Sequence, residues 1–204
     1  FVPEYWYFLG KANYRLGTKD QVTFLGIAAL DNVKLFNDTE KKKYDNSRFL
    51  YSDQNQGVAG ITWRHLLPKG YSNVTLSQTL FTYEYRQDDT LHLVPIFSSS
   101  SHEYETALRS DLVLQLDKST EFSAGAQGKR VDFSSRILLP KFYTNYRDSL
   151  DINASLDTTA YKAAIYAQVV ESFSRHFKMT VGARADYFNL IEKAFVVSPR
   201  FSMS

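Results

Sequence analysis

The sequence predicts an all-β protein, an antiparallel up-and-down segment of a transmembrane β-barrel with about nine long strands. Apolar and polar side chains alternate with a period of two over segments of about eleven residues or more, whereas soluble strands centre on about five or six. Short and long connections alternate along the chain. Aromatic residues, 15% of the 204, gather at strand ends, where membrane barrels carry their interfacial girdles.

The alternation defines nine predicted strands, in order 4–16, 21–37, 57–67, 73–87, 102–116, 120–133, 159–173, 177–191 and 195–204. In the first, Trp6 and Phe8 lie on one face and Lys11 and Arg15 on the other. The second follows the turn Gly17–Asp20, whose glycine and aspartate are typical of hairpin turns. The first two strands therefore form a hairpin.

The third and fourth strands form a second hairpin, because the turn Pro68–Ser72 between them is rich in turn-forming residues. In the fourth strand the apolar side chains change face, from Leu76 and Leu80 to Phe81 and Tyr83. A β-bulge near Thr79 explains this change, and so does an incorrect register for this strand.

The fifth and sixth strands meet at the turn 117–119. The fifth shows the clearest alternation, with Leu108 and Leu112 at even positions and Arg109 and Asp111 at odd positions. A helical stripe does not explain this stretch as well. We expect the leucines to face lipid and the charged side chains to line the interior of the barrel.

The seventh and eighth strands are joined by the short turn 174–176. The eighth places Val181 and Ala183 on one face and Arg184 and Asp186 on the other. In Ser-Pro-Arg at 198–200, we interpret the proline as the start of paired strand, where a missing N–H removes a donor before the ladder has begun. These strands continue the pattern of one apolar and one charged face.

Three connections are long and polar, at 38–56, 88–101 and 134–158, and they alternate with the short turns until the last connection, near residues 192–194. An up-and-down barrel across an asymmetric membrane sorts its connections in this way, with tight turns on the periplasmic side and long loops on the extracellular side. A soluble Greek-key sandwich has no reason to do so. We therefore expect the three long connections to be extracellular.

Composition excludes several classes of protein. The chain has no cysteine, which excludes disulfide scaffolds and thiolate metal sites. Its 24 basic and 22 acidic residues leave a net charge of +2, which argues against nucleic acid as a partner. No run approaches the ~20 apolar residues of a membrane-spanning helix. Because the chain ends inside a predicted strand, we expect it to be part of a longer protein.

Motifs near the C-terminus carry a family resemblance. A strand with the sequence Tyr161–Gln168, YKAAIYAQ, precedes Gly-Ala-Arg-Ala-Asp-Tyr at 182–187 and Ser-Pro-Arg at 198–200. The order and spacing of these motifs resemble the barrel of TonB-dependent outer-membrane receptors. The stretches Gly10–Leu16 and Gln21–Gly26 are also similar to hairpins of these receptors.

This resemblance implies a barrel of twenty-two strands around an N-terminal plug domain, with residues 1–204 forming part of that one barrel domain. The plug and the remaining strands are not in this sequence. The implied location is the outer membrane of a Gram-negative type of cell. The implied function is TonB-energised uptake of a scarce, bulky nutrient, such as a siderophore-iron complex, cobalamin or a glycan. The implied partners are outer-membrane lipid and lipopolysaccharide, the nutrient, and the TonB complex acting through the plug.

The sequence offers little for catalysis, and we predict no enzyme activity, no cofactor and no metal site. The four histidines are scattered, without a metal-binding spacing. Glu103 and Glu105 share one face of a strand, which is typical of a lumen lining rather than of a glycosidase pair. The candidate ligand contacts lie in the lumen or in the loop 134–158: Glu105, Arg109, Asp111, Tyr143, Tyr146, Arg147, Arg184 and Asp186.

Three alternatives stay open. Lys41, Lys42 and Lys43 form a cationic tract that is either a solvated loop or a contact for lipopolysaccharide phosphates. A soluble all-β carbohydrate-binding module is the second function that the composition allows. An outer-membrane barrel enzyme is the third, and its one indication is His102 beside the serines 98–101.

Overall fold

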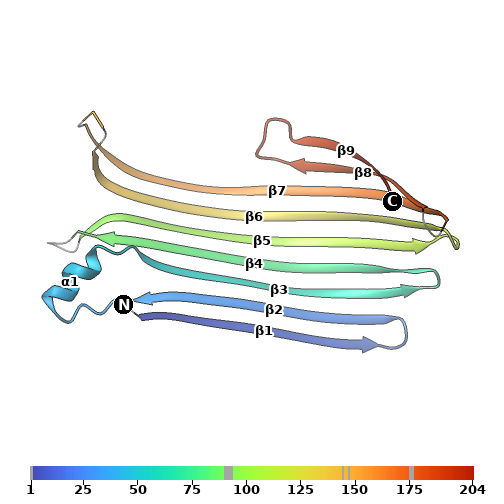
Figure 1. Ribbon diagram of the computed structural model, residues 1–204, viewed down its shortest axis with the longest axis horizontal. Helices are drawn as coiled ribbons and strands as arrows, with labels where there is room; N and C mark the ends of the chain where they lie inside the picture. Colours follow the sequence, from blue (N-terminus) through green and yellow to red (C-terminus); the bar gives the residue numbers. More distant parts are fainter. Residues whose placement is uncertain (1, 90–93, 144, 147, 175–176) are drawn as a thin grey trace.

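In the computed structural model, which describes residues 2–89, 94–143, 145–146, 148–174 and 177–204, the strands form one antiparallel sheet (Figure 1). The sheet has nine strands in the order of the sequence, so each strand is hydrogen-bonded to its neighbours in the chain. The elements are β1 (Val2–Leu16), β2 (Asp20–Lys34), α1 (Glu40–Ser47), β3 (Tyr51–Leu67), β4 (Gly70–Asp88), β5 (Pro95–Gln115), β6 (Thr120–Tyr143), β7 (Ser149–Ser174), β8 (Phe177–Phe188) and β9 (Phe195–Met203). The predicted fold class, an up-and-down β-barrel segment, is confirmed.

The registers divide the side chains between two faces, because directly paired residues of antiparallel strands point to the same side. Leu76 pairs with Leu108 and with Ile61, and Ile61 pairs with Phe24. We call this side the apolar face; its large exposed side chains are Trp6, Phe8, Phe24, Leu30, Ile61, Trp63, Leu76, Tyr104, Leu108, Tyr161, Ile165, Val181, Tyr187 and Phe201. The opposite side is called the polar face. Leu108, Leu112, Val181 and Ala183 share the apolar face, as predicted.

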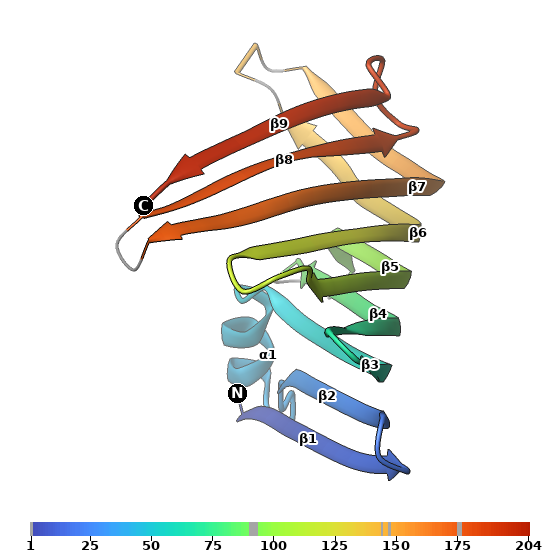
Figure 2. The same ribbon diagram turned by 90° about the vertical axis from the view of Figure 1, so that its right-hand side faces the viewer.

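The sheet is a single layer, which the end view in Figure 2 shows. Among the described residues, the buried apolar side chains are small, namely Ala107, Val131, Ala160 and Ala164. All four lie on the polar face, by the same pairing rule. A soluble sheet of this size covers its apolar side with a second layer, whereas here that side is exposed. No described helix is long and apolar enough to span a membrane.

The two ends of the sheet differ. The tight turns after β1, β3 and β5 lie at one end, on the right of Figure 1. The first of them contains Gly17, whose φ of +79° is the left-handed conformation that a hairpin turn requires. Helix α1 and the ends of β4 and β6 lie at the opposite end, and the shorter β8 runs toward that end but stops near the middle of the view. The sorting of turns and longer connections is therefore present in three dimensions, and it includes the β8–β9 connection.

Two of the three predicted long connections, 88–101 and 134–158, are much shorter than expected, because β5 begins at Pro95, β6 continues to Tyr143 and β7 begins at Ser149. Serines 98–101, predicted to be loop, pair on one side with residues 83–86 and on the other with 135–138. Their polar composition is typical of a loop, but both neighbouring strands pair with them. The connection predicted at 38–56 contains α1, and β3 already starts at Tyr51.

No β-bulge occurs near Thr79, because the register of β4 is continuous from Gly70 to Arg86 against both neighbours. The register shift recorded for β4 falls between Gln87 and Asp88. The change of face is instead a feature of the side chains. Leu76 and Leu80 belong to the apolar face, while Phe81 and Tyr83 stack on the polar face with ring centroids 6.4 Å apart. The change of face therefore needs neither a bulge nor a shift of register near Thr79.

The β5–β6 turn yields a prediction about pH. Asp117 Oδ1 accepts hydrogen bonds from the backbone N–H groups of Ser119 at 2.8 Å and Thr120 at 2.9 Å. These bonds, with those from both hydroxyls, lower the pKa of Asp117 to about 2. Because the folded pKa lies below the ordinary value of 3.8, the stabilisation is present above pH 4 and is lost as the pH falls toward 2.

We therefore expect the urea midpoint of the protein in detergent to fall between pH 4 and pH 2 by more than that of the variant Asp117→Asn. The amide cannot titrate, so the variant lacks this contribution at every pH. Both proteins share all other carboxylates, which makes the difference between their pH slopes specific to the turn. Equal slopes in the two proteins would contradict the assignment.

Candidate functional site

The candidate site is a cluster of charged and hydroxyl groups on the polar face of β5–β8. Asp111 on β5 pairs with Gly125, Gly125 with Tyr166, and Tyr166 with Arg184 on β8. Adjacent strands lie about 4.8 Å apart. This row of four residues therefore brings Asp111 and Arg184, 73 positions apart in the sequence, onto one stretch of wall.

Asp111 is the centre of the cluster. Arg109 donates to its carboxylate twice, from Nε at 2.7 Å and from Nη2 at 3.0 Å. The phenol of Tyr166 donates to Asp111 Oδ1 at 2.8 Å, reaching across β6. Such charge-assisted bonds are short and directional, so β5 and β7 together hold one carboxylate in a fixed position.

Gly125 makes this contact possible because it lies between Asp111 and Tyr166 in the register. A Cβ atom at position 125 would collide with the Tyr166 ring and would lie 2.9 Å from both Asp111 Oδ1 and the Ser110 carbonyl oxygen. A glycine in a strand often marks such a close approach. Here the approaching group is the ring of Tyr166.

Two further ion pairs complete the cluster. Arg184 donates from Nε to Asp186 Oδ1 and Oδ2, both at 2.9 Å. Lys129 on β6 donates to Glu105 on β5 at 2.7 Å. A cavity of about 250 Å³ beside Arg184 and Asp186 is lined by Gln127, Lys129, Lys162, Ala163, Ala164, Arg184, Asp186, Tyr187 and Phe188. The three cations and three carboxylates of the cluster cancel, so the wall is neutral but rich in hydrogen-bonding groups.

The sequence-predicted residues fall into two places. Glu105, Arg109, Asp111, Arg184 and Asp186 all belong to the cluster on the polar face. Sequence reasoning missed Lys129 and Tyr166, although each lies on the polar face of its strand by the period of two. The strand period of two would therefore have been enough to place both side chains on the polar face.

The loop candidates lie far from the cluster. Tyr143 is the last residue of β6, 18 positions from Gly125, which corresponds to roughly 60 Å along the strand; its side chain is outside the described ones. Tyr146 is 89% exposed between β6 and β7. Arg147 lies outside the described residues. The structure therefore does not join the predicted loop contacts and the predicted lumen contacts into one site.

The described residues hold no group of three or more His, Cys, Asp or Glu side chains arranged for a metal ion. Ser100 Oγ lies 3.4 Å from His102 Nε2, which is long for a hydroxyl that a base activates. His65 is bonded to Asp20 at 2.7 Å near the tight turns. His92 and His176 lie outside the described residues.

No protein-family model and no curated protein matches the chain. Among solved structures, the chain is similar to the outer membrane transporter YddB from Escherichia coli, with a TM-score of 0.65 and 10% sequence identity. The match covers 96% of this chain and 28% of that one. At this level of identity the likeness shows the fold, an outer-membrane β-barrel wall. The chain spans little more than a quarter of the length of that transporter.

Proposed function

We propose that the chain forms part of the barrel wall of a transporter in the outer membrane of a Gram-negative type of cell. The observation that carries this proposal is the division of nine long strands into an exposed apolar face and a charged polar face. Lipid offers no hydrogen bonds, so a β-sheet enters a membrane only as part of a closed barrel with its apolar side outward. The likeness of the fold to an outer membrane transporter supports the same conclusion.

The proposed activity is TonB-energised uptake of a scarce and bulky nutrient, a siderophore-iron complex, cobalamin or a glycan. The order of the motifs at 161–168, 182–187 and 198–200 supports this finer assignment by resemblance. In such a barrel the polar face lines the lumen. The Asp111 cluster then presents hydrogen-bonding groups to the solute or to a plug domain, which in turn links the barrel to the TonB complex.

The soluble alternative fits the structure less well. A carbohydrate-binding sandwich buries the apolar sides of two sheets against each other, whereas the described strands form one sheet with Leu76 and Leu108 about half exposed. The enzyme alternative rests on Ser100 and His102, whose separation of 3.4 Å does not favour it.

The function is tested with the complete gene in its native host. We expect deletion of the gene to abolish uptake of one of three labelled probes: a ferric siderophore, cobalamin or an oligosaccharide. Inactivation of TonB should abolish uptake of the same probe. Unchanged uptake of all three after deletion would contradict a transport role, and uptake that survives the loss of TonB would contradict the energy source.

A separate prediction concerns orientation. The chain has no cysteine, so single cysteines report position directly. In intact cells we expect a large, membrane-impermeant maleimide to label Lys41→Cys in α1 but not Thr18→Cys or Lys118→Cys in the tight turns. The last two should react only after the outer membrane is permeabilised. Labelling of all three in intact cells would reverse the proposed topology.

A further inference from the structure

The cavity of about 250 Å³ beside the charged cluster is formed by β6, β7 and β8. Its charged lining residues are Lys129, Lys162, Arg184 and Asp186, which all point to the polar face. Pockets that enclose a whole small ligand measure about 300–1,000 Å³. This cavity therefore accommodates one arm of a bulky solute rather than the whole molecule.

Two lysines lie directly opposite each other at this cavity. Lys129 on β6 pairs with Lys162 on β7, and both point to the polar face because Lys129 also pairs with Ala107. Like charges in directly opposite positions of an antiparallel pair repel each other. The carboxylates nearby therefore decide whether the positive charge at the cavity is balanced.

The carboxylates at the cavity already have partners. Glu105 accepts a hydrogen bond from Lys129 Nζ at 2.7 Å, and the two side chains are only 20% and 29% exposed. Asp186 accepts from Arg184 Nε through both of its oxygens. Within the described part of the chain, Lys162 forms no ion pair. The three cations at the cavity thus meet two carboxylates, and one positive charge is left over.

This remaining charge belongs to Lys162. The residue is exposed, and its ammonium group lies 5.2 Å from the centre of the Phe188 ring. Such a cation–π contact holds the ammonium group in place without neutralising it. An anion that enters from the polar face can therefore contact Lys162 without breaking an existing ion pair.

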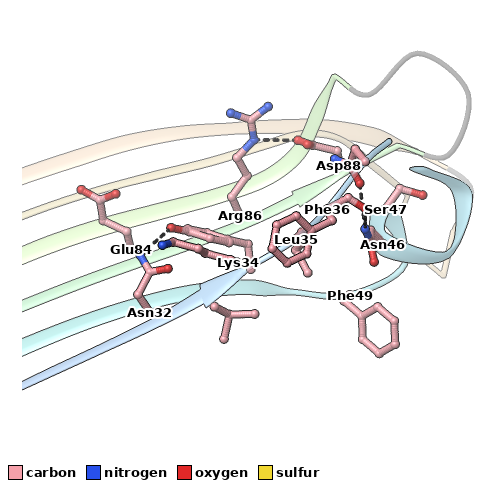
Figure 3. Close-up of a pocket in the computed structure, with 13 residues that line it drawn as sticks. Asn32, Lys34, Leu35, Phe36, Asn46, Ser47, Phe49, Glu84, Arg86 and Asp88 are labelled. Atoms are coloured by element: carbon pink, nitrogen blue, oxygen red, sulfur yellow. Dashed lines mark hydrogen bonds and ion pairs between the residues drawn. The ribbon is translucent and has the colours of Figure 1, made fainter. Parts of the chain in front are cut away.

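The largest cavity found among the described residues does not offer an unpaired cation of this kind. It has a volume of about 680 Å³ and lies between α1 and the ends of β2, β3 and β4 (Figure 3). Its two cations are paired, Lys34 with Glu4 at 2.8 Å and Arg86 with Asp88 at 2.7 Å. Lys34 also shares the apolar face with Leu30, so it does not point into the lumen.

We infer that the cavity at Lys162 binds one carboxylate group of the imported solute. A carboxylate carries a single negative charge, which equals the unbalanced positive charge, and it accepts strong hydrogen bonds from an ammonium group. A phosphate carries close to two negative charges at neutral pH. It would leave excess negative charge beside Glu105 and Asp186.

The inference rests on the proposed function in one respect, namely that the polar face lines the lumen through which the solute passes. It narrows the nutrient to one with at least one free carboxylate. The charged cluster around Asp111 supplies hydrogen-bonding groups, whereas Lys162 supplies the charge that selects this class of solute.

The test uses the complete purified protein in detergent, titrated with succinate and with the uncharged succinamide, with binding followed by ligand-observed NMR. We expect succinate to bind and succinamide to bind at least tenfold more weakly, since it keeps the carbon skeleton but lacks the charge. Lys162→Met should weaken the binding of succinate about tenfold, the scale of one charge-assisted contact. Lys162→Arg keeps the charge and should retain the binding. Inorganic phosphate should compete less well than succinate.

Lys11→Met is the matched control. Lys11 lies on the polar face at the same depth as Lys162, because one row of paired residues joins them: Lys11, Leu25, Gly60, Ser77, Ala107, Lys129 and Lys162. It belongs to β1, however, and β1 is far from β7 in the order of the sheet. Its loss should leave the affinity for succinate unchanged.

Absence of succinate binding, equal affinities in the wild type and Lys162→Met, or the same loss from Lys11→Met would each overturn the inference. Succinamide that binds as tightly as succinate, or phosphate that binds more tightly, would overturn the carboxylate as the ligand. These outcomes are separate from the uptake assays. A transporter of a nutrient without a carboxylate would pass the uptake assays and fail this binding test.

Discussion

Leu108→Arg is expected to lower the free energy of unfolding of the complete barrel by about 2–4 kcal/mol, the cost of a cationic side chain on the lipid side near the bilayer centre. Leu108 lies on the apolar face, in register with Leu76 on β4, and its side chain is about half exposed. An arginine there would have to leave water for hydrocarbon or deform the bilayer around it. Urea titration of the protein in lipid vesicles measures the loss.

The matched control is Ser77→Arg. Ser77 is next to Leu76 on β4, pairs with Ala107, and points to the polar face at nearly the same depth as Leu108. The same guanidinium then enters the water-filled side, so we expect a much smaller loss. Substituting Arg109 or Asp111 should also cost less than Leu108→Arg. If Ser77→Arg proved the more damaging change, the assignment of the two faces would be reversed.

Gly125→Ala is expected to lower the free energy of unfolding by about 1–3 kcal/mol, the usual cost of overpacking a close contact. The added Cβ would collide with the Tyr166 ring and crowd the Ser110 carbonyl oxygen at 2.9 Å. The ring can swing away, but the backbone of β5 cannot. We therefore expect the variant to lose the hydrogen bond from Tyr166 to Asp111.

Tyr166→Phe separates the hydrogen bond from the crowding. It removes only the phenolic hydroxyl and keeps the ring, and we expect it to lower the free energy of unfolding by about 1 kcal/mol. In the Gly125→Ala background the same change should cost almost nothing, because the bond is already lost. Gly128→Ala is the control, since a Cβ there meets nothing within 4 Å. Additive losses in the double variant would show that Gly125 does not hold Tyr166 over Asp111.

The face of each side chain was predictable because it depends on the strand period alone. Leu108, Leu112, Val181 and Ala183 lie together as predicted, and so do Glu105, Arg109, Asp111, Arg184 and Asp186 on the other side. The period of two acts within one strand and needs no partner. This is also why nine strands were predicted and nine are found.

The strand ends were less predictable. Serines 98–101 and the residues after Phe133 continue their strands beyond the apolar belt. Serines 98–101 are polar on both faces of their strand, so the alternation disappears there while the backbone pairing continues. The short helix α1 was also missed, although Thr39 caps it by accepting a hydrogen bond from the Lys42 N–H at 3.3 Å.

The sequence by itself determined the fold class, the number of strands and the two faces, since these follow from local alternation. Only the tertiary structure decided which residues meet across the sheet. The row Asp111, Gly125, Tyr166 and Arg184 depends on three inter-strand registers, and the period within one strand does not set how far that strand is shifted along the next. The cavity beside α1 likewise depends on where β2, β3 and β4 end relative to one another, because its walls come from α1 and from the ends of these strands.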